Sequence, residues 1–557
     1  MKRLFLVMVI LLLPAVTQLM RTGYYPMHDD LQAMRQLEMD KCFTGSVMAW
    51  QFPCRWVTDM GYGYGYPLFN FYPPLPYYFG QLVHLTGFSF IGTVKVMGII
   101  GFAASLVTMY LLAAEFWGRR GGMLAALFYL YAPYHSTDFY VRAAINEFWA
   151  LVWYPLIYWV TYKMIKEGKR WIPWVAMSVA ALMLSHNPML MIFAPTYLVW
   201  IILWWIKFRS VKSFGNLALS AVWAFGLAAF FTLPVILEAK YVSIWTLTSG
   251  YFNYLAHFLD WRQMLLKINW GYGESVFGPN DTMSFAVGYL HWIVPALIVG
   301  TALAWKKMRQ QMGIILFLAG IIGGTLFMMH WKATPIWQRV PPLEFLQFPW
   351  RLLTLTIFAG SFLSGAAVLF VPKKWLQLFL AAILTLLLVL NANYFRPHDW
   401  WPWVYDAYKF SGELWRLQTT AGIFDYLPKW APFPPADGRK GLVEFAKGSG
   451  TYKVENFRSN FQQYTVDVAT GGAVLEIQTY YFPGWRVWLD KGEVAIDPYR
   501  DPVLGRMRID ATEGRHYLIA RFTDTPVRMA ANAISLLAWV TLILYFVPWP
   551  KRLTSRI

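Results

Sequence analysis

Leu4-Phe5-Leu6-Val7-Met8-Val9-Ile10 opens an apolar segment that runs to Met20, and Tyr24-Tyr25-Pro26-Met27-His28-Asp29-Asp30 follows it closely. About 20 apolar residues are needed to cross roughly 30 Å of hydrocarbon, so the segment is typical of a membrane anchor. A cleaved signal peptide is the alternative, but residues 18–21 are not a small-x-small cleavage site. We therefore expect a span whose far end carries two adjacent carboxylates.

The composition of the whole chain predicts a polytopic α-helical membrane protein. Of its 557 residues, 57% are hydrophobic and only 14% are charged, and the mean hydropathy of +0.39 is beyond that of an ordinary soluble domain. Apolar stretches predict about twelve transmembrane helices, near residues 4–20, 91–116, 121–135, 145–165, 172–186, 188–206, 214–237, 284–305, 312–329, 350–371, 374–392 and 529–549.

The formal charge of +18 is explained by membrane topology rather than by a polyanionic partner. Lysine and arginine gather in alternate loops, at residues 2–3, 119–120, 166–170, 207–212, 306–309, 373–374 and 551–552. This is the positive-inside pattern, and it predicts a plasma (inner) membrane protein with both termini in the cytoplasm. No nucleic-acid partner is expected, and the long loops fall on the extracytoplasmic side.

The first outer loop, residues 21–90, contains the only two cysteines, Cys42 and Cys54. Outside the cytoplasm they form either a disulfide or two unpaired thiols, and the sequence favours neither. Residues 30–41 have near-helical apolar spacing, which predicts an amphipathic helix. Residues 74–85 suit a short membrane segment or a helix in the interface, and the charge topology favours the interface.

A second, soluble region is predicted between the last two spans. Alternating apolar and polar residues at 452–454, 464–468, 473–477 and 516–522 indicate strands, with a turn at 481–485. One small extracytoplasmic β-sandwich is the simplest interpretation. The predicted domains are a transmembrane domain at 1–392, a mainly β domain at 393–528, and a final helix with a cytoplasmic tail at 529–557.

Polar and ionisable residues gather at the predicted outer ends of the helices, where such residues are usually paired or functional. They are Asp138, Arg142, Asn146, Glu147, His186, Glu238, Lys240 and Arg351. A cavity that they line would suit a substrate that is part lipid and part phosphate, because guanidinium and ammonium groups bind phosphate. For Arg142 with Glu147 the alternative is a structural ion pair, and for His186 it is a helix cap.

Several motifs resemble known membrane enzymes. An anchor span, an outer-loop acid, Pro73-Pro74-Leu75 and Glu115-Phe116-Trp117-Gly118-Arg119-Arg120 occur in an order that resembles the GT-C superfamily of glycosyltransferases, which use polyprenyl-phosphate-linked sugars. Nearly the whole chain is similar to a bacterial family labelled "6-pyruvoyl-tetrahydropterin synthase-related", which is related to membrane glycosyltransferases of the YfhO type. The motifs that carry this similarity are Arg55-Trp56, residues 63–69, Val141-Arg142 with Glu147, residues 270–273, residues 346–351 and residues 481–485.

The resemblance implies that an acid of the first loop is the catalytic base. Asp29 matches that position best, and Asp30 either shares the role or caps the helix that begins there. The remaining candidates bind substrate, and they are His28, Arg55, Tyr66, Arg142, Glu147, His186, Lys240 and Arg351. No second acidic pair of the Asp-x-Asp type occurs, so we expect no metal or other cofactor. The pterin label finds no support, since no histidine cluster has zinc-ligand spacing.

The predicted function is transfer of a sugar from a polyprenyl-phosphate donor to an extracytoplasmic glycan, lipid or protein, at the membrane surface. A transporter or flippase of lipid-linked glycans is one alternative, which predicts internal repeats and helices broken at mid-membrane. The sequence has no such repeat. A non-catalytic assembly protein of the cell envelope is the other alternative, and it predicts that both acids are dispensable.

Overall fold

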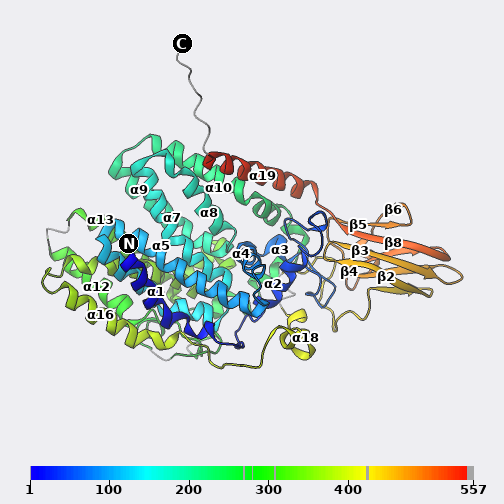
Figure 1. Ribbon diagram of the computed structural model, residues 1–557, viewed down its shortest axis with the longest axis horizontal. Coiled ribbons are helices and arrows are strands. Elements are labelled where there is room, and N and C mark those ends of the chain that lie inside the picture. Colours follow the sequence, from blue (N-terminus) through cyan, green and yellow to red (C-terminus); the bar gives the residue numbers. More distant parts are fainter. Residues whose placement is uncertain (1, 268–269, 279, 306–308, 422–425, 548–557) are drawn as a thin grey trace, which may run out of the picture.

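The protein is a bundle of apolar helices followed by a sheet-containing unit and one last helix (Figure 1). The computed structural model describes residues 2–267, 270–278, 280–305, 309–421 and 426–547. The long helices are α1 (Lys2–Val16), α5 (Phe90–Leu130), α7 (Ile145–Glu167), α8 (Ile172–Met183), α9 (Asn187–Phe208), α10 (Lys212–Leu237), α12 (Tyr289–Ala304), α13 (Met312–Met329), α15 (Leu353–Ser364), α16 (Leu376–Asn391) and α19 (Pro526–Phe546).

Every predicted span corresponds to one of these helices, although the helices differ in their capacity to cross a bilayer. Within the described residues, seven helical segments are long and apolar enough to span a membrane: 90–130, 187–208, 212–237, 312–329, 349–369, 376–394 and 526–546. Residues 6–20 and 289–304 form shorter apolar helices. The protein is therefore a membrane protein, while the expected count of twelve spans exceeds the seven that satisfy length and composition alone.

Helix α5 contains two of the predicted spans because it folds back on itself. Gly118 has φ +70° and ψ 174°, which interrupts the helix and suits glycine. A Cβ atom built on Gly122 would lie 2.9 Å from the Cα atom of Ala114, so the two arms run side by side after a sharp turn. The turn places Arg119 and Arg120 between the arms, where the charge pattern predicts an inner loop.

The C-terminal unit has two antiparallel sheets at one end of the molecule (Figure 1). One sheet has the order β1 (Val443–Lys447), β4 (Ala473–Tyr480), β7 (Arg506–Ala511). The other has the order β2 (Gly450–Arg458), β3 (Phe461–Val468), β8 (Gly514–Phe522), β5 (Trp485–Leu489), β6 (Gly492–Val494). The predicted strands and turn are confirmed, because alternate residues of β8 are buried as period-two patterning requires. The domain boundaries at 392 and 528 stay a prediction.

The first outer loop packs between the helices and the sheets. Its Trp56 ring lies 5.4 Å from the Trp485 ring, edge to face, and 5.3 Å from the Phe522 ring. The Tyr64 ring lies 5.2 Å from the Tyr480 ring, in a tilted arrangement. This aromatic contact explains why the segment after Trp50 is so rich in glycine and aromatic residues: it is a packing surface for the β unit.

The loop also contains three short helices, α2 (Gln32–Lys41), α3 (Leu68–Phe71) and α4 (Leu75–His84). The predicted helix at 30–41 is confirmed as α2, but its polar face is buried rather than exposed. Gln36 donates to Gln81 of α4 at 3.1 Å, and Glu38 accepts the backbone N–H groups of Thr58 and Asp59 at 2.7 and 3.0 Å. Polar residues on α2 therefore connect the parts of the loop.

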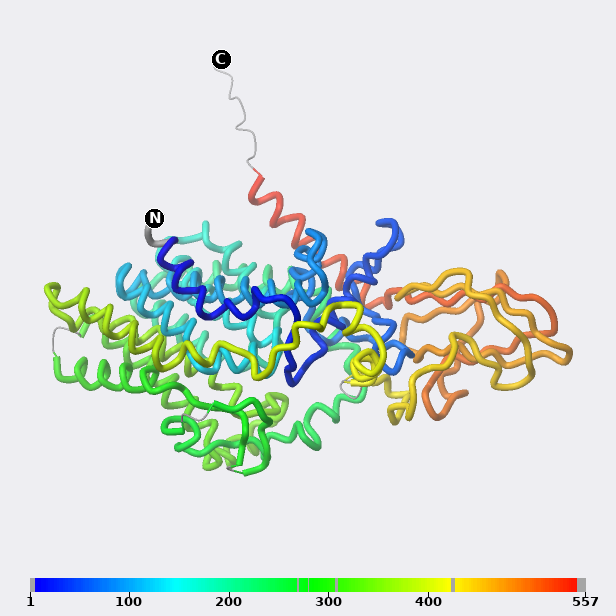
Figure 2. The backbone as a smooth tube through the Cα atoms, turned by 60° about the horizontal axis from the view of Figure 1, so that its bottom comes forward, coloured from blue at the N-terminus to red at the C-terminus, as the bar shows by residue number. Residues whose placement is uncertain are grey.

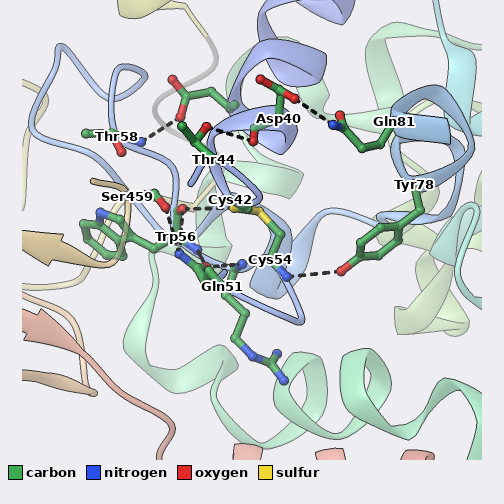
Figure 3. The surroundings of a disulfide bond; sticks show 12 residues. Asp40, Cys42, Thr44, Gln51, Cys54, Trp56, Thr58, Tyr78, Gln81 and Ser459 are labelled. Carbon is green, nitrogen blue, oxygen red and sulfur yellow. Dashed lines mark hydrogen bonds between the residues drawn. A yellow bond between two sulfur atoms is a disulfide. The ribbon is translucent and has the colours of Figure 1, made fainter. Parts of the chain in front are cut away.

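Cys42 and Cys54 form a disulfide, with Cα atoms 5.6 Å apart (Figure 3). Beside it, the Gln51 side-chain oxygen accepts the backbone N–H groups of Arg55 and Trp56 at 2.5 and 2.7 Å. Of the two alternatives left by the sequence, the structure contains the bridge. It closes a loop that starts at the end of α2.

Peptide mapping without reductant is expected to find one cross-linked pair containing Cys42 and Cys54. Both cysteines are buried, so alkylation should need reductant together with denaturant. Alkylation of both thiols in the native, unreduced protein would contradict the bridge and also the extracytoplasmic position of the loop.

Candidate active site

A cavity of about 830 Å³ lies where the first outer loop meets the starts of α7, α9 and α15. Seven of the ten predicted site residues line it: His28, Asp29, Asp30, Arg142, Glu147, His186 and Arg351. Its other wall is apolar and includes Met191, Val235, Ile244, Leu247, Phe252 and Phe345. Charged and apolar surfaces therefore share one space of a size suited to a substrate.

The backbone of the acidic loop is fixed against the segment that precedes α7. The N–H of His28 donates to Val141 O at 3.0 Å, and the N–H of Asp29 donates to Arg142 O at 3.1 Å. Ala143 has φ +56°, a left-handed conformation that is costly for a residue with a side chain. These contacts hold Asp29 beside Arg142, 113 positions later in the chain.

The side chain of Asp29 is held through one oxygen only. Its Oδ2 accepts Arg35 Nη1 at 2.6 Å and Gln32 Nε2 at 3.1 Å. Within the described residues Oδ1 accepts no hydrogen bond, and the side chain is 36% exposed. One carboxylate oxygen is thus oriented, and the other is accessible from the cavity.

Asp30 has a different environment. Its Oδ2 accepts Lys409 Nζ at 2.8 Å, while its Oδ1 is buried without a partner among the described residues. Desolvation raises the pKa of Asp30 despite the opposing charge of Lys409. Asp30 does not cap α2, whose N-cap is Leu31 without a side-chain hydrogen bond, so the predicted capping role is wrong. Asp30 forms an ion pair with Lys409 instead of a helix cap.

A buried ion-pair cluster forms the next part of the wall. Glu147 Oε2 accepts both Arg142 Nη2 and Arg351 Nε at 3.1 Å, and its Oε1 accepts the Tyr134 hydroxyl at 2.6 Å. Two guanidinium groups therefore share one carboxylate. The predicted structural pair of Arg142 and Glu147 is confirmed, and it faces the cavity as well.

A second acid belongs to this cluster. Arg142 also pairs with Asp138 and lies 4.5 Å above the Trp350 ring. Burial, with the nearby charge of Glu147, raises the pKa of Asp138 well above its ordinary value. Two arginines and two acids therefore meet in this part of the wall.

Two donors of the cavity have no acceptor among the residues that the structure describes. His186 is the N-cap of α9, where its Nδ1 accepts Met189 N–H at 3.2 Å, so the neutral ring carries its proton on Nε2. Arg351 Nη1 donates to Leu346 O and Gln347 Oε1, both at 2.8 Å. Among the described residues, His186 Nε2 and Arg351 Nη2 have no partner. The predicted helix cap at His186 is confirmed without removing the ring from the cavity.

Three predicted site residues lie elsewhere. Arg55 is buried and donates to Asn70 Oδ1 at 3.0 Å and to Asn532 Oδ1 at 2.8 Å. Tyr66 is buried beneath the glycine-rich turn, and Lys240 is exposed over the Tyr241 ring. Arg55 lies outside the cavity because it binds Asn532 of α19, and Tyr66 because it packs in the core that the first loop shares with the β unit.

Two cations of the cavity were missed by the sequence analysis. Arg35 looked like one of the polar residues of an amphipathic helix, and its distance of six positions from Asp29 was a usable signal. Lys409 comes from α17 (Asp406–Lys409), far along the chain, and has no sequence signal. Only the tertiary fold brings it to Asp30.

A second cavity of about 630 Å³ shares His28 with the first. It is lined by Trp270, Tyr272, Thr282 and His398 among others, and His28 Nε2 lies 2.8 Å from Tyr272 O. The intervening Gly271 and Gly273 fit closely against Thr282: a Cβ atom on either would approach it to 1.9 Å. The motif at 270–273 thus forms a close-packed wall beside the acidic loop.

No metal centre is evident within the parts of the chain that the structure describes, because three or more His, Cys, Asp or Glu side chains nowhere gather in suitable positions. Metal independence stays a prediction.

Comparisons with known proteins found similar folds only among solved structures. No protein-family model matches the chain, and no curated protein matches it. The cryo-EM structure of arabinofuranosyltransferase AftD from Mycobacteria has 14% identity and a TM-score of 0.46, over 72% of this chain and 28% of that chain. The crystal structure of the Archaeoglobus fulgidus oligosaccharyltransferase with zinc and sulfate has 14% identity and a TM-score of 0.39, over 71% of this chain and 53% of that chain. This chain thus matches about a quarter to a half of the length of those proteins.

Proposed function

We propose that the protein is a membrane glycosyltransferase that moves a sugar from a polyprenyl-phosphate-linked donor to an extracytoplasmic acceptor, with Asp29 as the general base. The observation that carries the proposal is the accessible Oδ1 of Asp29 in a cavity that also contains the unpaired donors of His186 and Arg351. The arrangement supplies a proton acceptor and an anion site together.

On the acceptor side, Asp29 Oδ1 removes the proton of an acceptor hydroxyl as its oxygen attacks the anomeric carbon. The bond between that carbon and the phosphate oxygen breaks, and the lipid phosphate leaves with the electron pair. Attack opposite the leaving group inverts the anomeric configuration. Arg35 and Gln32 keep Asp29 oriented through Oδ2, which is the positioning that general-base catalysis requires.

On the donor side, Arg351 Nη2 and His186 Nε2–H hold the phosphate. Charge-assisted hydrogen bonds to the leaving phosphate strengthen as negative charge develops on it. The apolar residues of the same cavity accommodate the polyprenyl chain. The mixed lining therefore fits a donor that combines a lipid with a phosphate.

Transfer by washed membranes is expected to be insensitive to EDTA, since arginine side chains neutralise the phosphate in place of a divalent cation. The measurement is transfer of labelled sugar before and after chelation. A magnesium-dependent transferase treated in parallel serves as the control. Loss of activity that added Mg²⁺ or Mn²⁺ restores would contradict metal independence.

We place the acceptor in the second cavity, because His28 borders both cavities and is the residue next to Asp29. Trp270→Ala is expected to raise the KM for the acceptor by about 2- to 12-fold, the range that a lost ring contact of about 0.5–1.5 kcal/mol gives. The KM for the donor should not change. The exposed Trp331 lies away from both cavities, and Trp331→Ala is the matched control. An effect on the donor KM alone would reverse the assignment.

A further inference from the structure

The disulfide-closed loop has an apolar tip that no described part of the protein covers. Val47, Met48, Trp50 and Phe52 are 69%, 101%, 40% and 72% exposed. Residues 43–54 include no charged side chain. Large exposed apolar groups collected on one loop mark a contact surface rather than ordinary surface variation.

The base of this loop lies at the level of the ends of two apolar helices. Arg55 Nη2 donates to Phe230 O of α10 at 3.0 Å and to Asn532 Oδ1 of α19 at 2.8 Å. At 1.5 Å per residue, these contacts lie about 10 Å inside the end of α10 and about 9 Å inside the start of α19. The loop is therefore anchored about two turns inside the ends of two helices that are long and apolar enough to cross a membrane.

Arg458 of β2 lies against Gly45, but the side chains packed on the tip itself are aromatic. Phe43 packs edge to face on Trp50 at 5.4 Å, and Phe52 packs on Tyr78 of α4 at 6.1 Å. Helix α4 itself exposes Phe79 (38%) and Leu82 (62%). Figure 2 shows blue segments of the first loop beside the red α19, at the end of the bundle nearest the sheets. Aromatic and apolar side chains at this level are typical of the membrane interface.

We infer that residues 47–52 insert into the bilayer, at the boundary between hydrocarbon and headgroups in the leaflet nearest the β unit. The bilayer is favoured over a protein partner because the tip is uncharged and its base binds α10 and α19, two helices long and apolar enough to span a membrane. The disulfide and the hydrogen bonds of Gln51 hold the tip in its inserted shape. This inference is independent of the proposed enzymatic activity.

The test is the depth of a nitroxide at position 48, measured by EPR power saturation in lipid nanodiscs. Replacing Met48 by p-acetylphenylalanine allows labelling through a ketone and leaves Cys42 and Cys54 untouched. The same label at Leu536, exposed on α19, and at Val503, exposed in the β unit, gives lipid and water references. At position 48 we expect oxygen to relax the label more than a water-soluble nickel complex does, as at 536 and unlike 503.

Two results would overturn the inference. Greater relaxation by the nickel complex at position 48 means that the tip is in water. Low accessibility to both reagents means that a protein covers it, a second copy of the chain included. The same label at position 47 gives a second measurement on the same loop. There too, oxygen should relax the label more than the nickel complex does.

Discussion

Asp29→Asn is expected to lower sugar transfer by about 10²- to 10⁴-fold, the contribution of a positioned general base. The amide keeps the shape of the side chain and an oxygen for Arg35, but it cannot take the acceptor proton. The assay is transfer from a radiolabelled lipid-linked sugar in membranes that contain equal amounts of variant and wild-type protein. Because the backbone contacts of Asp29 do not use its side chain, the loop should retain its position.

Matched variants distinguish the loss of the base from the loss of a neighbouring charged group. Asp30→Asn should have a much smaller effect, because both oxygens of Asp30 are unavailable to a substrate: one binds Lys409 and the other is buried. Asp467→Asn, on the exposed surface of the β unit, should have none. Arg35→Ala should lower kcat more than it raises the KM for either substrate, because Arg35 acts through Asp29.

Full transfer by Asp29→Asn would exclude Asp29 as the base. A complete absence of transfer by the folded wild-type protein, with normal envelope assembly by the Asp29→Asn variant, would favour the scaffold alternative. Movement of a lipid-linked glycan across the membrane without transfer would favour the flippase. The three functions therefore give different results with the same pair of proteins.

Glu238→Ala is expected to destabilise the protein by about 3–5 kcal/mol, the cost of leaving one partner of a buried ion pair alone. Glu238 Oε2 accepts Arg528 Nε at 2.9 Å and Asn70 Nδ2 at 2.9 Å, and Oε1 accepts the Thr525 hydroxyl at 2.6 Å. Both charged residues are almost fully buried. The variant leaves the Arg528 charge without its carboxylate where α10, the first loop and α19 meet. Unfolding in mixed micelles measures the change.

The control for this prediction is an exposed pair of the same chemistry. Glu413 and Arg416 form a solvent-exposed ion pair, so Glu413→Ala should leave the unfolding midpoint almost unchanged. The double variant Glu238→Ala/Arg528→Ala should lose less free energy than the sum of the single variants, because it leaves no unpaired charge. Strictly additive losses would show that the two residues do not interact energetically.

Most of the architecture could be predicted from local sequence. Apolar runs locate the helices because each must satisfy its own backbone hydrogen bonds in lipid. Alternation at 464–468 and 516–522 locates strands for an equally local reason. The count of spans was harder, since Gly118 reverses α5 within what the structure assigns as one helix, and α8 is too short to qualify by length.

The candidate site was predictable only in part. Arg142, Glu147, His186 and Arg351 were identified because charge at a helix end is conspicuous in an apolar chain. Arg55 was chosen because the motif Arg55-Trp56 carries the family resemblance, yet it belongs to a buried network with α19. Charge at a membrane boundary indicates that a partner is needed, but the sequence does not say whether that partner is a substrate or another part of the protein.

The pair of acids after the first span illustrates what the sequence determines and what the tertiary structure determines. The sequence by itself determined that Asp29 and Asp30 follow a membrane segment, because hydrophobicity and charge act locally along the chain. Only the tertiary structure distinguished them: Arg35 and the backbone of Arg142 orient Asp29 with one oxygen open, while Lys409 occupies Asp30. These partners come from distant segments, and the environment of a carboxylate depends on atoms a few ångströms away, which sequence separation does not reveal.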